Sequence, residues 1–232
     1  MIVVMLGPPG AGKGTQCELL GEKLALPHIA TGDLLREAMA RGTPLGQLAR
    51  PYIERGELVP DDVMINIINE WLATPGHEHG FILDGFPRTV NQARALDQAL
   101  ARVGKGVDRV IYLSVPVEEL LQRIAGRYVC PQCGASYHLR TSPPRQSGYC
   151  DQCGSTLTQR PDDRREVAER RMAVYFAQTA PVIDYYQKRG VLSEVNGAQS
   201  VTAVLDAELA ILLTLPSRTH TRTDRHGDPS QI

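Results

Sequence analysis

A glycine-rich segment at residues 7–15, GPPGAGKGT, carries the residue types that bind phosphate groups. It follows a short apolar run and is expected to begin a helix. Glycines allow backbone N–H groups to converge on phosphate oxygens, and a helix N-terminus adds a favourable dipole. The spacing of Gly7, Gly12 and Lys13 is that of a P-loop. The segment therefore predicts binding of a nucleoside triphosphate, with a glycine-rich turn that has no ligand as the alternative.

Two near-copies of a cysteine knuckle, CPQCG at residues 130–134 and CDQCG at residues 150–154, form the second chemical signature. Paired CxxC motifs are typical of a tetrahedral zinc site, and four thiolates leave no open position on the metal. The zinc would therefore be structural. Two disulfides or a redox dithiol are the alternatives. The fifth cysteine, Cys17, has no partner in the sequence and is expected to be a small core residue.

Further phosphate-binding groups are expected among the arginines. The run DGFPR at residues 84–88 follows an apolar stretch, which places it at the carboxyl end of a strand, where open α/β sheets bind ligands. Arg123 and Arg127 are four residues apart on a predicted helix and project from one face. Guanidinium groups bind phosphate oxygens in a bidentate fork. Phosphoryl transfer depends mainly on positioning and charge neutralisation, so it needs no His/Asp or Ser/His constellation.

The secondary-structure elements that must position these residues alternate between strands and helices along the chain. Apolar runs predict buried strands at residues 2–6, 81–83, 110–115 and 191–195. Periodicity and first-turn residues predict helices over residues 61–73, 90–102 and 116–126. Strands that alternate with helices predict an α/β fold with a parallel sheet and helices on both faces.

Two regions interrupt this alternation. Residues 31–59 contain two short helical patterns, separated by Gly42-Thr43-Pro44, and no convincing strand. Residues 127–161 are rich in Cys, Pro, Ser and Gly, which indicates an irregular or small β insertion. The end of the chain, residues 217–232, is polar and is expected to be disordered.

The bulk composition restricts the class of protein. The chain has 232 residues, a formal net charge of −1 and only 5% aromatic residues, which argues against a general nucleic-acid-binding protein. No basic leader precedes the first apolar run, and no stretch approaches the roughly 18 apolar residues needed to span a bilayer. We therefore expect a cytoplasmic protein without membrane partners, whose thiols stay reduced. Nothing in the sequence indicates more than a monomer.

Taken in order, these motifs resemble the adenylate kinase family. The matching segments are the P-loop, Thr31-Gly32-Asp33 with Arg36, DGFPR with Gln92, Arg123 with Arg127, and the run from Arg160 to Arg171. The resemblance extends over about residues 1–213. It implies reversible phosphoryl transfer from ATP to AMP, giving two ADP, with Mg²⁺ and a role in nucleotide homeostasis and biosynthesis.

The same resemblance implies a division of the chain. A P-loop kinase core would comprise residues 1–29, 60–125 and 164–216. A helical insertion that binds the nucleoside monophosphate would span residues 30–59, and a small zinc-binding lid would span residues 126–163.

Site residues follow from the resemblance position by position. The expected catalytic residues are Lys13, Arg88, Arg123, Arg160 and Arg171. ATP is expected to bind at Gly10, Ala11, Gly12, Lys13, Gly14, Thr15, Arg123, Arg127, Ser136, Tyr137 and Gln199. AMP is expected to bind at Thr31, Arg36, Glu57, Leu58, Val59, Gly85, Phe86, Pro87, Arg88, Gln92, Arg160 and Arg171. Asp84 would organise magnesium through water, and the zinc ligands would be Cys130, Cys133, Cys150 and Cys153.

Several alternatives remain open at this point. Thr89 and Gln92 also have the spacing of a capping box, and Asn196 with Gln199 could likewise be a helix cap. The acceptor could be another nucleoside monophosphate, and GTP could replace ATP as donor. A zinc-ribbon ATPase that binds nucleic acid is the rival from another class, and a salt-dependent affinity for DNA or RNA would support it.

Overall fold

The computed structural model describes residues 1–214, so the predicted disordered tail lies outside the described residues. Its centre is a five-stranded parallel sheet with the strand order β2-β3-β1-β4-β7. The strands are β1 (Ile2–Leu6), β2 (His28–Ala30), β3 (Phe81–Asp84), β4 (Arg109–Ser114) and β7 (Leu192–Asn196). The four predicted strands are confirmed. The three-residue strand β2 was not predicted, because its sequence HIA is too short to show a pattern.

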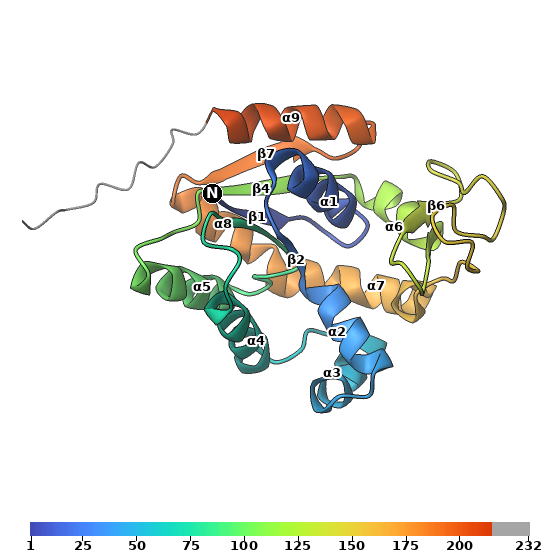
Figure 1. Cartoon of the computed structure of the whole chain (residues 1–232), viewed down its shortest axis with the longest axis horizontal. Helices are drawn as coiled ribbons and strands as arrows, with labels where there is room; N and C mark the ends of the chain where they lie inside the picture. Colours follow the sequence, from blue (N-terminus) through green and yellow to red (C-terminus); the bar gives the residue numbers. More distant parts are fainter. Residues whose placement is uncertain (215–232) are drawn as a thin grey trace, which may run out of the picture.

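The sheet is buried on both faces, as its apolar runs require. Side chains alternate along β1, so Ile2, Val4 and Leu6 join one core and Val3 and Met5 join the other. The first core contains residues of α4 (Asp61–Ala73), α5 (Val90–Arg102) and α8 (Pro181–Lys188). The second contains residues of α1 (Lys13–Leu24) and α9 (Val201–Leu213). Figure 1 shows α1 and α9 together on one side of the sheet and α4 and α5 on the other.

Further helical segments belong to the same part of the molecule. They are α6 (Val117–Ala125), the 3₁₀ turn η1 (Pro161–Asp163), α7 (Arg165–Val174) and the π-helical turn η2 (Tyr175–Thr179). The predicted helices over residues 61–73, 90–102 and 116–126 correspond to α4, α5 and α6. No helix within residues 1–214 is both long and apolar enough to cross a membrane.

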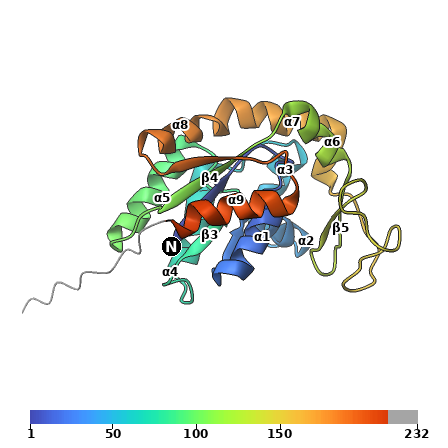
Figure 2. The same ribbon diagram turned by 90° about the horizontal axis from the view of Figure 1, so that it is seen from above.

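Two pieces project from this core (Figures 1 and 2). The first consists of α2 (Thr31–Ala40) and α3 (Pro44–Glu54), which confirms the two short helices predicted between residues 31 and 59. Thr43 caps α3 by accepting a hydrogen bond from the Gly46 N–H at 3.2 Å. The second contains the antiparallel strands β5 (Arg127–Val129) and β6 (Ser136–His138), which confirms a small β insertion.

One buried group in α9 opposes the stability of the fold. The Glu208 side chain is fully buried and neither carboxyl oxygen has a hydrogen-bond partner in the described part of the chain. Burial raises the pKa of Glu208 to about 8. Since the same carboxyl ionises near its ordinary pKa of 4.5 in the unfolded chain, folding takes up a proton between these two values.

We expect Glu208→Gln to remove this pH dependence. Relative to the variant, the wild type should lose stability as the pH rises from about 4.5 to about 8, by on the order of one kcal/mol per pH unit, and the difference should then level off. Denaturant titrations at pH 5, 7 and 9 measure it. Glu70→Gln, at an exposed position of α4, is the control. Parallel stability curves for wild type and Glu208→Gln would contradict a neutral buried carboxyl.

Candidate active site

The P-loop joins β1 to α1 at the carboxyl edge of the sheet. Gly12 precedes α1 in a left-handed conformation and supplies no side-chain cap, so the first N–H groups of the helix stay available for an anion. Gly10 has φ +85°, and a Cβ there would lie 2.9 Å from the Leu120 carbonyl oxygen. The loop therefore needs glycine at this position both for its backbone angle and for its contact with α6.

Lys13 and Arg88 are two cations of this site. The Lys13 ammonium group donates hydrogen bonds to the carbonyl oxygens of Gly7 at 2.8 Å and Pro8 at 3.0 Å. The Arg88 Nε donates to the Gly85 carbonyl oxygen at 2.8 Å. Neither side chain forms an ion pair with any of residues 1–214. Burial lowers the pKa of Lys13 to about 8 and that of Arg88 to about 10. Half-buried cations that form no ion pair within residues 1–214 cost free energy, so both positions favour an anionic ligand.

A cavity of about 1020 Å³, including its part open to solvent, connects these two cations. Its walls include ten of the twelve residues expected to bind AMP: Thr31, Arg36, Glu57, Leu58, Val59, Gly85, Pro87, Arg88, Gln92 and Arg171. Gly85 is required here, because it has φ +78° and a Cβ would lie 2.8 Å from the Thr31 hydroxyl. The structure thus brings most of the expected acceptor set together around one space.

Phe86 and Arg160 are the two exceptions. Phe86 is buried in the core beneath the cavity, joined to Pro87 by a cis peptide bond, and does not line the cavity. The side chain has a packing role, and the expected contact of Phe86 with AMP stays a prediction. Arg160 lies outside the cavity wall and pairs with Asp33 of α2 at 3.3 Å.

Gln92 has a local structural role as well as a place in the cavity wall. Thr89 caps α5 by accepting a hydrogen bond from the Gln92 N–H at 3.1 Å, which confirms the predicted cap. The Gln92 amide accepts from the Arg88 N–H at 2.7 Å and donates to Asp61 at 2.7 Å. The alternative cap at Asn196 and Gln199 is wrong, because Ser200 caps α9.

Two buried acids organise the late arginines. Asp163 accepts two hydrogen bonds from Arg127, one of them from Nε at 2.8 Å, and a third from Arg171 at 3.0 Å. Asp162 lies 3.0 Å from Arg171 and 3.7 Å from Arg36. The two carboxylates hold arginines from three elements near one another without neutralising all of them.

The residues expected at the donor side are more dispersed. Arg123 donates to the Gly197 carbonyl oxygen at 2.9 Å and pairs with Glu119. Ser136 and Gln199 are exposed; Ser136 begins β6, and Gln199 lies in the loop between β7 and α9. The Tyr137 side chain is buried in the lid, where its hydroxyl accepts from the Asp151 N–H at 2.8 Å. Its backbone is therefore the part left for a nucleotide.

Asp84 ends β3 beside the P-loop. A Cβ on Gly14 would lie 3.6 Å from an Asp84 carboxylate oxygen, so the carboxylate lies against the start of α1. Within residues 1–214 the carboxylate makes no hydrogen bond that competes with a cation or its water ligands. Its oxygen donors and its position suit magnesium.

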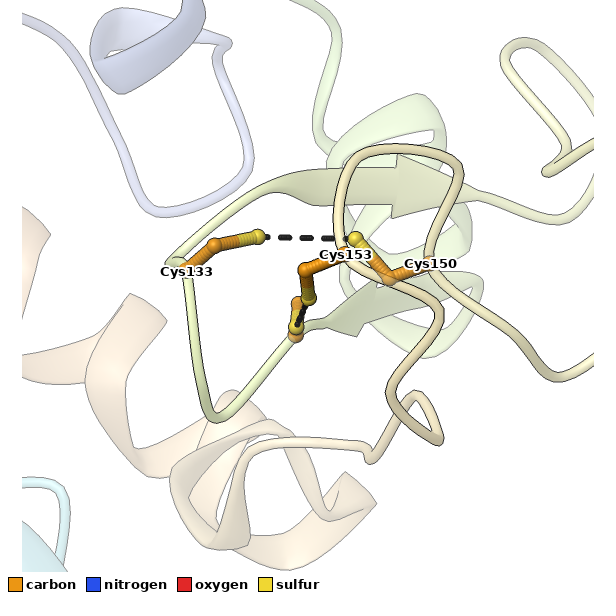
Figure 3. A group of neighbouring side chains, drawn as sticks. Cys133, Cys150 and Cys153 are labelled. Atoms are coloured by element: carbon orange, nitrogen blue, oxygen red, sulfur yellow. Dashed lines mark hydrogen bonds between the residues drawn. The ribbon is translucent and has the colours of Figure 1, made fainter.

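The four lid cysteines converge in space. Their Sγ atoms all lie within 4.8 Å of one another, with Cys130 and Cys150 buried and Cys133 and Cys153 exposed. Sulfur atoms of Cys133 and Cys150 lie 3.4 Å apart, as do those of Cys130 and Cys153 (Figure 3). Disulfide bonds need about 2.05 Å, so these are four free thiols. The Tyr137 hydroxyl hydrogen-bonds to the Cys150 sulfur at 3.5 Å and lowers the pKa of Cys150 to about 6. Such a cluster can hold a metal ion.

Comparison with known proteins identifies the family. The family model for adenylate kinase matches residues 5–191. The chain belongs to the adenylate kinase family. The adenylate kinase of Moorella thermoacetica is 53% identical over 205 residues, which covers 88% of this chain and 94% of that protein. The adenylate kinase of Archaeoglobus fulgidus is 50% identical over 217 residues, covering 94% of this chain and all of that protein. The chain is accordingly a nucleoside monophosphate kinase with an α/β P-loop core.

Sequence reasoning missed part of this adenylate kinase site. Asp162 and Asp163 were not singled out, although adjacent acids directly after Arg160 were a usable signal. The apolar wall of the cavity, which includes Leu35, Ile53 and Met64, gave no signal of its own. Apolar residues at helical spacing are typical of any core, so only the fold could assign them to a cavity.

Proposed function

We propose that this chain catalyses reversible transfer of the γ-phosphoryl group from Mg·ATP to AMP, with Lys13 and Arg88 on the two reacting nucleotides. The observation that carries this assignment is the pair of unpaired cations lining one cavity. A P-loop lysine suits the β- and γ-phosphates of the donor. A second cation at the carboxyl end of β3 suits an acceptor phosphate, whose oxygen is already anionic and needs no general base.

On the acceptor side, the base of AMP would lie among Leu35, Val59 and Met64, which form the apolar part of the cavity. Thr31 and Gln92 supply polar edges, and the Glu57–Val59 segment supplies backbone groups. Arg36, Arg88 and Arg171 would bind the phosphate of AMP and the group in transfer. Guanidinium forks hold several oxygens at once, which positions an in-line transfer.

On the donor side, backbone N–H groups from Gly10 to Thr15 would hold the phosphates of ATP. Arg123 and Arg127 would bind the same phosphates, with Ser136, the Tyr137 backbone and Gln199 near the nucleoside. Arg160, held beside Asp33 in this structure, would turn toward the phosphates. Asp84 would hold Mg²⁺ through the water ligands of the ion, and the ion would supply charge neutralisation at the phosphates.

The lid metal is proposed to be one structural Zn²⁺ per chain. A site of four thiols, with no oxygen or nitrogen ligand, favours a thiophilic ion. Four thiolate ligands would fill a tetrahedral coordination sphere, which is typical of structural and not of catalytic zinc. Residues 126–163 would then close as a lid, and residues 30–59 would close over AMP, so that water is excluded during transfer. Reduced thiols at such a site suit a cytoplasmic location, and the chain would act as a monomer.

One assay tests the reaction directly. The pure protein is mixed with Mg²⁺, one nucleoside triphosphate and one nucleoside monophosphate, and diphosphate formation is measured. ATP with AMP should give the highest kcat/KM. A higher value for UMP, CMP or GMP would reassign the acceptor, and a higher value for GTP would reassign the donor.

Arg88→Ala should weaken AMP binding much more than ATP binding. The guanidinium group is assigned to the acceptor phosphate, and a charge-assisted hydrogen bond contributes about 1.5–3 kcal/mol. This corresponds to roughly a 10- to 150-fold increase in the Kd of AMP. Separate calorimetric titrations with each nucleotide measure both effects.

Arg41→Ala is the matched control, because Arg41 is an exposed arginine at the end of α2 that pairs with Glu37. It should change neither affinity. An equal loss of AMP and ATP affinity in Arg88→Ala would show that the acceptor site is misplaced.

A further inference from the structure

A second group of metal-ligating side chains lies beneath the P-loop, away from the lid cysteines. It consists of Cys17, His28 and Asp84, whose ligand atoms all lie within 4.8 Å of one another. A thiol, an imidazole and a carboxylate come together here from α1, β2 and β3. This is a mixed ligand set, whereas the magnesium role proposed for Asp84 needs oxygen ligands alone.

The fold brings the three residues together by register. Ala30 lies opposite Asp84 in the β2–β3 pair, so His28, two residues earlier, projects from the same face of the sheet as Asp84. Cys17 is four residues after Lys13 on α1 and therefore lies one turn below the P-loop lysine on the same helix face. Its side chain is fully buried between α1 and the sheet.

Within residues 1–214, no hydrogen bond occupies the ligand atoms of this cluster. The His28 Nε2 is buried and has no hydrogen-bond partner in the described chain. Nor does the Cys17 thiol or the Asp84 carboxylate make a hydrogen bond with any of residues 1–214. A buried polar atom without a partner costs free energy, and a metal ion would satisfy all three groups at once.

We propose that Cys17, His28 and Asp84 form a second, inhibitory metal site that selects thiophilic divalent ions such as Zn²⁺ over Mg²⁺. Three protein ligands of these types match a zinc site with one open position, which water can fill. Zinc–ligand distances of about 2.0–2.3 Å would require the three ligand atoms to come closer together by about 1 Å. The thiol releases its proton to solvent as the metal–sulfur bond forms.

The inhibition rests on the proposed function, because it uses the role of Asp84. A carboxylate bound to Zn²⁺ no longer organises the water ligands of Mg²⁺ at the phosphates. Binding of Mg·ATP and of the second zinc ion should therefore oppose each other, and the coupling must be reciprocal.

Equilibrium dialysis of the zinc-loaded protein against free Zn²⁺ tests the site without an activity measurement. The wild type should bind two zinc ions per chain, one in the lid and one here. Cys17→Ala and His28→Gln should each keep the lid ion and bind the second at least about tenfold more weakly, since even the loss of an outer-shell partner has that effect. His79→Gln is the control, because His79 is an exposed histidine outside this cluster. This variant should bind two ions.

Turnover measured at the same concentrations of free Zn²⁺ separates the proposed second metal site from the proposed role of Asp84 in catalysis. Zinc should inhibit the wild type and His79→Gln, while Cys17→Ala and His28→Gln should resist it at unchanged activity without zinc. One ion per chain in the wild type, or equal binding by all four proteins, would overturn the second site. A second ion that depends on Cys17 and His28 but leaves turnover unchanged would support the site and overturn the role of Asp84.

Discussion

Lys13→Met is expected to lower kcat by about two to three orders of magnitude while the fold remains intact. Removing one preorganised electrostatic stabiliser has an effect of that size. In the structure the ammonium group is held only by the Gly7 and Pro8 carbonyl oxygens and pairs with no acid within residues 1–214. Its removal therefore breaks no ion pair, and it relieves the desolvation that lowers the pKa of Lys13 to about 8. The melting temperature without nucleotide should be unchanged or higher.

The measurement pairs steady-state kinetics with thermal unfolding. Lys23→Met, at an exposed position in the last turn of the same helix, is the control and should leave both quantities unchanged. Wild-type turnover in Lys13→Met would remove Lys13 from the mechanism. A large fall in melting temperature would instead assign Lys13 a structural role in the P-loop.

The parts of the fold that could be predicted are those whose signal is local. The five apolar residues of β1 are buried on both faces, and a continuous apolar run is the pattern that such a strand needs. The P-loop and the DGFPR run lie directly after strands, so their position at the carboxyl edge of the sheet followed from strand order alone. The convergence of the two CxxC knuckles could also be predicted, because each knuckle presents two thiols from one turn.

The parts that could not be predicted depend on contacts between distant segments. Cys17 was expected to be a small core residue, and it is fully buried, but its neighbours His28 and Asp84 come from two other elements. Strand β2 was missed, and without β2 nothing in the sequence places His28 beside Asp84. Asp163 is similar, because its link to Arg127 spans 36 positions in the chain.

The core of the lid is very small, so we expect the lid to depend on the proposed metal. Only four residues of the lid cluster are buried: Cys130, Tyr137, Cys150 and Leu157. Two of the four are proposed zinc ligands, and a third, Tyr137, forms a hydrogen bond with one of them. A core of this size cannot offset the ordering entropy of the surrounding loops, so small domains of this kind need a metal or disulfides. Structural zinc contributes on the order of 10 kcal/mol in small zinc-finger peptides.

Cys150→Ser should therefore loosen residues 127–161 first and the core much less. We expect the metal content to fall well below one ion per chain and the melting temperature to fall with it. Activity should remain measurable at low temperature and fade on mild warming. The reason is that Arg127 begins β5 and Arg160 follows the second knuckle, so a loosened lid cannot hold either arginine against the phosphates. Ser147→Ala, an exposed lid position between the knuckles, is the control and should keep the metal and both properties.

Chelation of the wild type provides the same test without a substitution. Metal stoichiometry, melting temperature and turnover are measured before and after chelation, at low and raised temperature. A structural ion predicts that the loss of activity follows the loss of lid order and is small in the cold. If the metal-free protein kept its full melting temperature but lost all turnover at every temperature, the ion would be catalytic. The four-thiolate set argues against that outcome, because it leaves no open coordination position for a substrate or water.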